Sequence, residues 1–321
     1  MSYEKDLVSI IIPCYNGENF IENNFRSIIN QTYKKLEVVF VDDGSTDGSY
    51  EKAVKYIDLF QKEGIKLICL KKENGGAASA VDLALKTIKG EFFQLFDIDD
   101  YIYPKNIEDK YNYLTEYKDC AFVRNEGEIF NVEKNKVVSI FSARKKEKRT
   151  YNIFYDLLFG RTWNWPGSFL VRSETFFSVN NGKDIYLSRY GQSMQILLPI
   201  SYKHKCGYIP NVLTRYFEYQ KSVSHVSSYE KNVELLNGYK DIRVNVLKQM
   251  GVCDKKLLDK IEQFYLKQKL DLAIRMNKTK EIDVFYKQIK KTPKIRLMML
   301  SNKRKGLKNL YIKLAKLIRR K

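Results

Sequence analysis

The sequence predicts an α/β fold in which helices cover both faces of a mostly parallel sheet, followed by a C-terminal helical region. Over the first hundred residues, short apolar segments rich in β-branched and aromatic residues alternate with longer segments whose apolar residues recur at helical spacing. This alternation is typical of right-handed βαβ units, whose parallel strands are buried between helices. The chain has 321 residues, of which 44% are hydrophobic, so it can bury a sizeable core and is not a disordered protein.

The elements of the first hundred residues follow from these two patterns. We expect strands at residues 7–12, 36–41, 65–70 and 91–96, and helices at residues 18–30, 48–61 and 77–89. The apolar stripe of the second helix is expected to consist of Tyr50, Val54, Ile57 and either Leu59 or Phe60. Ligands bind beyond the carboxyl ends of parallel strands, so the loops after these strands are the first candidates for a site.

The rest of the chain mixes strands and helices before it becomes helical. Residues 120–124 and 127–132 suggest a β-hairpin, and further strands are expected at residues 168–172, 206–209 and 213–217, with a helix across residues 192–202. From about Tyr229 onward the pattern is helical and basic. We therefore expect two parts, residues 1–225 with the sheet and residues 226–321 with the basic helical region.

Composition narrows the setting and the partners. The five cysteines are scattered without a CxxC pair, so neither a disulfide framework nor a zinc site is indicated, and free thiols in a reducing cytoplasm are expected. We expect no signal peptide, and no apolar stretch approaches the roughly 20 residues that span a bilayer. The formal net charge of +19 indicates an anionic partner, such as a lipid surface, a nucleic acid or a phosphate-bearing substrate.

Polar clusters follow three of the expected strands. They occupy residues 13–16 (Pro-Cys-Tyr-Asn), 42–47 (Asp-Asp-Gly-Ser-Thr-Asp) and 97–100 (Asp-Ile-Asp-Asp). Each cluster alone is compatible with an ordinary turn or a helix cap. Together they bring acids to one edge of a sheet, where a cation or hydrogen-bond donors must compensate them. Oxygen-rich sites of this kind suit Mg²⁺ or Mn²⁺, which bridge carboxylates to substrate phosphates.

The order and spacing of these segments resemble the family 2 glycosyltransferases. The resemblance is carried by residues 8–16 (VSIIIPCYN), 27–33 (SIINQTY), 41–47 (VDDGSTD), 74–76 (NGG) and 90–100 (GEFFQLFDIDD). It is most specific over residues 7–104 and weaker to about residue 225. It implies the GT-A fold, a nucleotide-sugar donor that is often UDP-linked, and usually inversion at the anomeric carbon.

The resemblance also implies roles for single residues at the donor. Pro13, Tyr15 and Asp43 match residues that hold the base and the ribose, with Tyr15 stacking on the base. Asp97 and Asp99 match the DxD motif of the family.

The metal ligands are assigned from the same motif. Asp99 is the expected ligand of Mn²⁺ or Mg²⁺, with Asp100 beside it, and Asp97 belongs with the donor-binding residues. His225 resembles a late histidine that often completes the metal site in GT-A enzymes. A surface histidine in a polar loop is an equally good interpretation of His225.

The sequence departs from the family pattern in two places. Val81 stands where an arginine is common in the helix after the Gly-rich turn, and Gln192 and Ser193 stand where a Glu-Asp pair usually supplies the catalytic base. A neutral amide and a hydroxyl cannot serve as a carboxylate base. The base therefore has no assignment from the motif, and Asp100 and Asp184 are the candidates.

Two pairs of residues are candidates for contacts with the acceptor or the transferred sugar. Gln192 and Gln195 are spaced i, i+3 on an expected helix, so they share a face, and amides both donate and accept hydrogen bonds. Trp163 and Trp165, the two tryptophans of the chain, could form an aromatic wall against a sugar ring. The alternative for both tryptophans is a place in the core.

The leading hypothesis is a cytoplasmic, metal-dependent and inverting glycosyltransferase of the hexosyltransferase class. Its donor would be a UDP-sugar, and its acceptor a surface polysaccharide, teichoic acid, glycolipid or glycoprotein precursor. A non-catalytic sugar-nucleotide binder is an alternative because Gln192 and Ser193 are neutral. A nucleotidyltransferase is disfavoured because no Gly-rich loop with Lys and Arg follows the first strand. A basic nucleic-acid-binding protein is disfavoured because no nucleic-acid module is evident.

The last residues predict a helix that rests on an anionic membrane surface. No acidic residue follows Asp283. Apolar residues recur at helical spacing at Leu307, Leu310, Tyr311, Leu314 and Leu317, and the flanking cations are Lys308, Lys313, Lys316, Arg319 and Arg320. This is the pattern of an interfacial helix at the inner face of the cell membrane. A helix packed on its own domain with a solvated basic face is the alternative.

Overall fold

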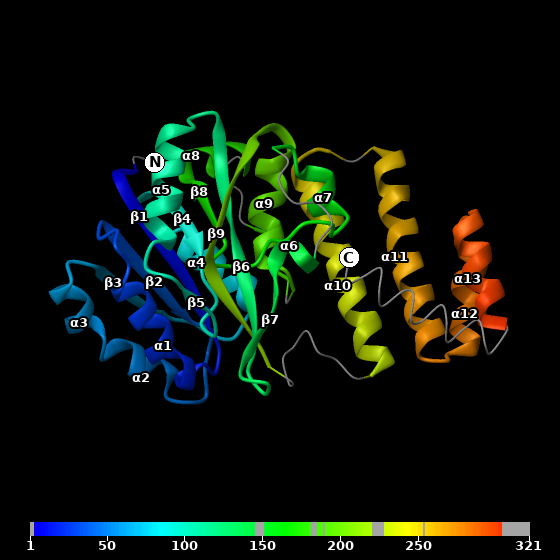
Figure 1. Cartoon of the computed structure of the whole chain (residues 1–321), viewed down its shortest axis with the longest axis horizontal. Coiled ribbons are helices and arrows are strands. Elements are labelled where there is room, and N and C mark those ends of the chain that lie inside the picture. Colours follow the sequence, from blue (N-terminus) through cyan, green and yellow to red (C-terminus); the bar gives the residue numbers. More distant parts are fainter. Residues whose placement is uncertain are drawn as a thin grey trace.

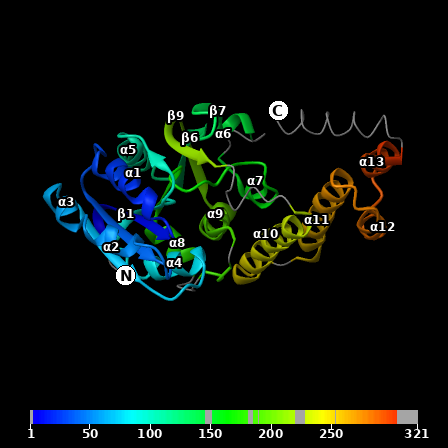
Figure 2. The same cartoon turned by 90° about the horizontal axis from the view of Figure 1, so that it is seen from below.

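A computed structural model gives the fold of the chain (Figure 1). The structure describes residues 3–144, 151–180, 185–188, 190–219, 228–252 and 254–303. These residues form a curled sheet with helices on both faces, and a group of long helices continues from one end of it (Figures 1 and 2).

One nine-stranded sheet runs through the described residues, in the order β3-β2-β1-β4-β8-β6-β9-β5 with β7 paired to β6. Its parallel half consists of β1 (Glu4–Cys14), β2 (Leu36–Asp42), β3 (Lys66–Lys71) and β4 (Gly90–Leu95). Its mixed half consists of β5 (Tyr101–Ile102), β6 (Cys120–Asn131), β7 (Lys136–Ile140), β8 (Phe169–Arg172) and β9 (Lys205–Glu218). The four strands expected in the first hundred residues are all present, and the α/β prediction is confirmed.

Each face of the sheet is covered by helices that contribute to a separate hydrophobic cluster. One cluster joins the sheet to α1 (Glu18–Ile29), α2 (Ser49–Val54), α3 (Ile57–Lys62) and α5 (Asn106–Glu116). The other joins it to α4 (Ala77–Leu85), α7 (Phe154–Leu158), α8 (Ser173–Asn180) and α9 (Gln192–Lys203). The short helix α6 (Phe141–Arg144) follows β7. Apolar surface of the helices is thereby removed from water on both faces, as the sequence predicts.

The helix expected at residues 48–61 differs from the prediction. It is broken into α2 and α3 at Lys55 and Tyr56. Phe60 is fully buried, whereas Val54 and Leu59 are each 37% exposed. Ile57 and Phe60 of the expected stripe do pack in the cluster with α1, whereas Val54, on the other side of the break, is exposed.

The hairpin expected at residues 120–132 is wrong, because these residues form the single strand β6. Likewise, the two strands expected at 206–209 and 213–217 are the single strand β9. Gly127 does not make a turn; a Cβ at this position would lie 2.2 Å from the Phe141 ring, so the glycine admits a close approach inside a strand. The β6–β9 ladder also shifts register on both sides of Glu126, which is where the sequence pattern is interrupted.

The C-terminal region is helical, as predicted, and consists of α10 (Tyr229–Gln249), α11 (Lys255–Arg275), α12 (Thr279–Gln288) and α13 (Pro293–Lys303). Helix α10 and the first half of α11 belong to the same hydrophobic cluster as α4 and α9. The second half of α11 packs with α12 and α13 in a cluster of its own. The two-part division at residue 225 therefore stays a prediction, and α10 shares its core with the sheet.

Three further expectations concern membrane spans, cysteines and the last segment of the chain. Among the described helices, none is both long enough and apolar enough to cross a membrane. Cys14, Cys69, Cys120 and Cys206 are free thiols. The amphipathic segment from Leu307 to Leu317 lies outside the described residues.

Candidate active site

The loops after β1 and β2 meet at the carboxyl edge of the parallel strands. Cys14 lies opposite Asp42 at the end of the β1–β2 ladder, so the two loops that follow these strands leave the sheet side by side. The Asn16 backbone N–H donates to Ser45 Oγ (2.9 Å), and the Thr46 N–H donates to Asn16 Oδ1 (2.8 Å). Tyr15 is 53% exposed beside these loops, so its ring is free to meet a ligand.

Asp43 joins the loop after β2 to the Gly-rich loop after β3. Its carboxylate is buried and accepts hydrogen bonds from the backbone N–H groups of Gly75 (3.0 Å) and Gly76 (2.7 Å). Lys72 Nζ donates to the same carboxylate at 2.9 Å. Three charge-assisted hydrogen bonds hold this corner rigid. The residue expected at the base and ribose therefore also orders the loop that would face them.

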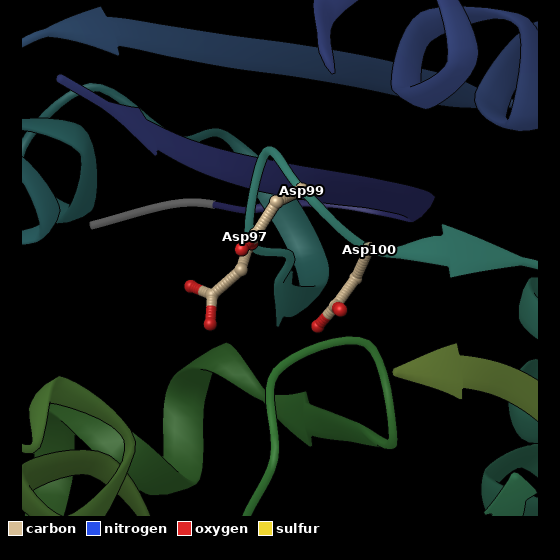
Figure 3. A group of neighbouring side chains, drawn as sticks. All are labelled: Asp97, Asp99 and Asp100. Atoms are coloured by element: carbon tan, nitrogen blue, oxygen red, sulfur yellow. The ribbon is translucent and has the colours of Figure 1, made fainter. Parts of the chain in front are cut away.

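Three acids gather between β4 and β5. Ligand oxygens of Asp97, Asp99 and Asp100 all lie within 4.8 Å of one another. Figure 3 shows the side chains of Asp97 and Asp100 leaving their loop on the same side. Asn24 of α1 holds the loop from behind, since its Nδ2 donates to the backbone oxygens of Asp97 (2.9 Å) and Asp100 (3.4 Å).

The three carboxyl groups are difficult to ionise together. Burial, and then the charge of Asp99, raise the pKa of Asp97 to about 7, against which a hydrogen bond from Gln192 acts. Burial raises the pKa of Asp99, and burial together with the two neighbouring acids raises the pKa of Asp100 well above its ordinary value. Like charges in a buried place have this effect unless a cation joins them.

The donor set fits a hard divalent cation. Asp100 Oδ1 accepts from the Phe217 backbone N–H (3.2 Å), but its buried Oδ2 has no hydrogen-bond partner among the residues that the structure describes. A divalent ion satisfies unpaired carboxylate oxygens and lowers raised carboxyl pKa values at the same time. Asp97 and Asp99 belong to the same cluster as Asp100, and their assignment to a donor and a metal stays a prediction.

Helix α9 brings Gln192 to the acidic cluster. Gly191 precedes the helix with φ at 69°, a left-handed conformation that favours glycine. Gln192 Nε2 donates to Asp97 Oδ1 at 3.2 Å. Gln195 is different: it is buried, and within the described part of the chain neither of its amide atoms has a hydrogen-bond partner. The expectation that both amides face a sugar is therefore wrong for Gln195, because helix packing turns it inward.

The two tryptophans also separate. Trp163 is completely buried, donates to the Asn125 backbone oxygen (3.3 Å), and has the Arg124 guanidinium 4.7 Å from its ring centre. Trp163 is therefore a core residue and not part of an acceptor wall, which corrects that expectation. Trp165 lines a cavity of about 490 Å³ that also reaches Asp97 and Gln192.

Comparisons with known proteins bear on this arrangement. The family model described as "Glycosyl transferase family 2" matches residues 9–179, more than half of the chain. The chain belongs to glycosyl transferase family 2. The resemblance inferred from the sequence motifs is thereby confirmed.

Relatives within family 2 match mainly the N-terminal part. An uncharacterized glycosyltransferase of Rickettsia typhi is 43% identical over 108 residues, which are 34% of this chain and 32% of the relative. Glycosyltransferase GlyG of Streptococcus pneumoniae is 35% identical over 119 residues, 37% of this chain and 38% of the relative. The match thus spans about a third of the length of these relatives.

Solved structures agree in fold over more of the chain. TarS residues 1–349 of S. aureus in complex with UDP has a TM-score of 0.55 at 18% identity, covering 92% of this chain and 78% of TarS. The mannosyltransferase PcManGT of Pyrobaculum calidifontis, in complex with GDP-Man and Mn²⁺, has a TM-score of 0.56 at 16% identity, covering 98% and 85%. At these identities the likeness concerns the fold, and it confirms the expected GT-A architecture.

The departures from the family 2 pattern have structural consequences. Val81 is fully buried in the cluster beneath α4, so its side chain takes no part in a phosphate site. Lys72 instead places a cation at the corner of the loops held by Asp43, through its ion pair with that residue. Sequence reasoning missed Lys72, although it follows a strand directly, where the strand-end rule applies.

Two expected site residues, Asp184 and His225, lie outside the described residues. Asp100 is buried and bonded to β9, so its geometry favours a structural or metal-holding role over that of an exposed base. Sequence reasoning also missed Asn24 and Arg243. Neither belongs to a strand-end motif: Asn24 of α1 reaches the acidic loop, and Arg243 of α10 lines the cavity beside Asp97, only through packing.

Proposed function

We propose that this protein is a metal-dependent glycosyltransferase that moves a sugar from a UDP-linked donor to a glycan, teichoic acid, glycolipid or glycoprotein acceptor with inversion. The observation that carries the proposal is the cluster of Asp97, Asp99 and Asp100 at the sheet edge, with the orphaned oxygen of Asp100 inside it. Such a cluster suits a divalent cation bound between protein carboxylates and a diphosphate.

Membership of the family and the structures of similar fold support the choice of donor. TarS 1–349 has been solved with UDP and with UDP-GlcNAc, and PcManGT with GDP-Man and Mn²⁺. The exposed ring of Tyr15 is available for stacking on a base, and base–aromatic stacking contributes about 1–3 kcal/mol per base. Uracil preference would then come from polar contacts at the loops tied together by Asp43.

The residues of the chain have distinct parts in the proposed reaction. Pro13, Tyr15 and Asp43 would bind the nucleoside. Asp99 and Asp97 would hold the divalent ion, with Asp100 supporting them. When bound, the divalent ion supplies Lewis-acid stabilisation of the leaving diphosphate. Gln192 orients the Asp97 carboxylate through its hydrogen bond.

The identity of the catalytic base is undecided between two acids. Gln192 and Ser193 are neutral, so neither can take the proton of an acceptor hydroxyl as a carboxylate would. We keep Asp184 and Asp100 as candidates, to be tested by substitution with Asn. Loss of turnover in only one variant, with UDP affinity retained, would identify the base.

The experiment that tests the function is calorimetry of UDP binding with Mn²⁺, with Mg²⁺ and in excess EDTA. We expect binding to need the ion, and we expect Asp99→Ala to abolish turnover without loss of the fold. Lys86→Ala is a matched control, since Lys86 is exposed and pairs with Asp82 on the surface of α4. Unchanged UDP affinity in EDTA would contradict the proposed metal dependence of donor binding.

A second candidate, a non-catalytic binder of nucleotide sugars, is favoured by the neutral pair at residues 192 and 193. Metal-dependent binding of UDP-sugars without hydrolysis or transfer to any acceptor would support this candidate. We also propose that residues 226–321 act as a second part that holds the enzyme peripherally at the inner face of the cell membrane, through the basic segment after Asn302.

A further inference from the structure

A cavity of about 490 Å³ opens beside the acidic cluster, and its described lining includes no residue of the loops that carry Tyr15 and Asp43. Its walls come from the Trp165 loop, from the start of α9 and from the middle of α10 and α11. Asp97 and Gln192 form the wall toward the cluster. The volume falls within the range of about 300–1,000 Å³ that is usual for small-molecule sites.

The lining of this cavity suits a sugar. Aromatic rings come from Trp165, Tyr216, Tyr239 and Tyr265, and amides from Asn164 and Gln268. Aromatic faces pack against apolar faces of sugar rings, and amides both donate and accept hydrogen bonds. Among the described residues of the lining, Asp97 is the one acid and Arg243 the one cation.

Arg243 is an unusual residue to find there. It is 8% exposed, its Nε donates to the Leu158 backbone oxygen (2.8 Å), and its Nη1 donates to the Tyr239 backbone oxygen (2.9 Å). Its guanidinium carbon also lies 5.8 Å from the centre of the Tyr265 ring, and among the described residues no carboxylate is recorded in an ion pair with it. Burial lowers the pKa of Arg243, yet a guanidinium stays charged in proteins.

Other arginines of the chain have the carboxylate partner that Arg243 lacks among the described residues. Arg215 is paired with Glu128 at 2.6 Å, and Arg275 with Asp271 at 3.2 Å. Arg172 is bonded to the backbone oxygens of Leu114 and Cys120, but it does not line the cavity. A buried cation that faces a cavity without a counterion favours an anionic ligand, and a guanidinium fits carboxylates and phosphates bidentately.

We propose that this cavity binds the acceptor, and that the acceptor is a glycan carrying an anionic group, a carboxylate or a phosphate, which pairs with Arg243. The inference rests on the proposed function and adds the chemical class of the acceptor to it. The anionic group lies over α10 while the reacting hydroxyl faces Asp97, so the charge selects the acceptor and sets its direction.

The test uses the full chain with saturating UDP and Mn²⁺, so that the donor site is filled. Glucose, glucuronic acid and glucose 6-phosphate are titrated, and tryptophan fluorescence is read because Trp165 lines the cavity. We expect at least one anionic probe to bind about tenfold more tightly than glucose, as a charge-assisted hydrogen bond provides. Which of the two binds more tightly separates a carboxylate-bearing from a phosphate-bearing acceptor.

Three variants complete the test. Arg243→Gln is expected to reduce the preference to within about twofold, whereas Arg172→Gln, the matched control, keeps it. Leu236→Trp fills the cavity and is expected to lose all three probes while UDP affinity stays unchanged. If Arg243→Gln does not fold, the wild type and Leu236→Trp still decide the question.

The proposal is overturned if the wild type binds glucose as tightly as both anions, if Arg243→Gln keeps the preference, or if Leu236→Trp still binds the anions. The last result would mean that the basic surface, and not the cavity, attracts them. Absence of UDP binding is a separate outcome that contradicts the proposed function, and the same probes titrated without UDP then decide the inference alone.

Discussion

The acidic cluster predicts that the protein freed of divalent ions gains stability as the pH falls. Folding raises the pKa of Asp97 from its ordinary value of 3.8 to about 7, because burial and the charge of Asp99 disfavour the ionised form. In the pH range between these values the native state therefore binds a proton that the unfolded chain does not. For one such group, linkage gives a gain of about 2 kcal/mol in unfolding free energy between about pH 7.5 and about pH 5.5.

The gain rises as the pH falls through the native pKa near 7 and is complete below the ordinary value of 3.8. Asp97 keeps some contact with solvent, so about 2 kcal/mol is an upper bound for its own contribution. Asp99 and Asp100, whose pKa values are also raised, act in the same direction.

The assay is urea unfolding in EDTA at the two pH values, for the wild type and for Asp97→Asn. The variant keeps every other titrating group but cannot ionise at residue 97, so the difference between the two proteins reports this carboxyl together with its coupling to Asp99 and Asp100. With excess Mn²⁺ the dependence should flatten or change sign, since protons then compete with the ion. The reasoning is refuted if both proteins show the same pH dependence in EDTA to within about 0.5 kcal/mol.

Three further predictions concern Asp43, Gln192 of α9 and the residues after Asn302. Asp43→Ala leaves two backbone N–H groups and the Lys72 ammonium without their acceptor and should lower the unfolding free energy by about 2–4 kcal/mol in urea; an unchanged midpoint contradicts this. Gln192→Ala should lower turnover about tenfold or more with little change in Tm, because it releases Asp97; wild-type turnover would place the acceptor elsewhere. A chain ending at Asn302 should no longer sediment with anionic liposomes, since each lost cation contributes about 1 kcal/mol. If the full-length and the shortened protein bind equally, or if neither binds, the segment after Asn302 is not a membrane-binding segment.

Local signals were sufficient for the parallel half of the fold. Strands β1 to β4 are apolar segments bounded by turn residues, and the clusters at their ends share one edge because parallel strands point the same way. The convergence of Tyr15, Asp43 and the acids after Phe96 could therefore be predicted from the order of elements alone. In this half the expected bounds of the strands differ from the observed ones by a few residues at most, and the main error is the break between α2 and α3.

The mixed half could not be predicted in the same way. β6 and β9 were each divided in the prediction, because a bulge and a glycine inside a strand have the same sequence pattern as a turn. What separates them is a contact across the fold, the Phe141 ring against Gly127, which no local window contains.

Family membership and the acids at one edge of the sheet could thus be inferred from the order of residues along the chain. Tertiary structure decided which side chains face the site: Trp165 lines the cavity while Trp163 is core, and Gln192 reaches Asp97 while Gln195 is turned inward. It also placed Arg243 beside residues that are far from it in the sequence. The physical reason is that strand order and periodicity are local properties of the chain, whereas burial and charge pairing depend on neighbours that only the folded chain brings together.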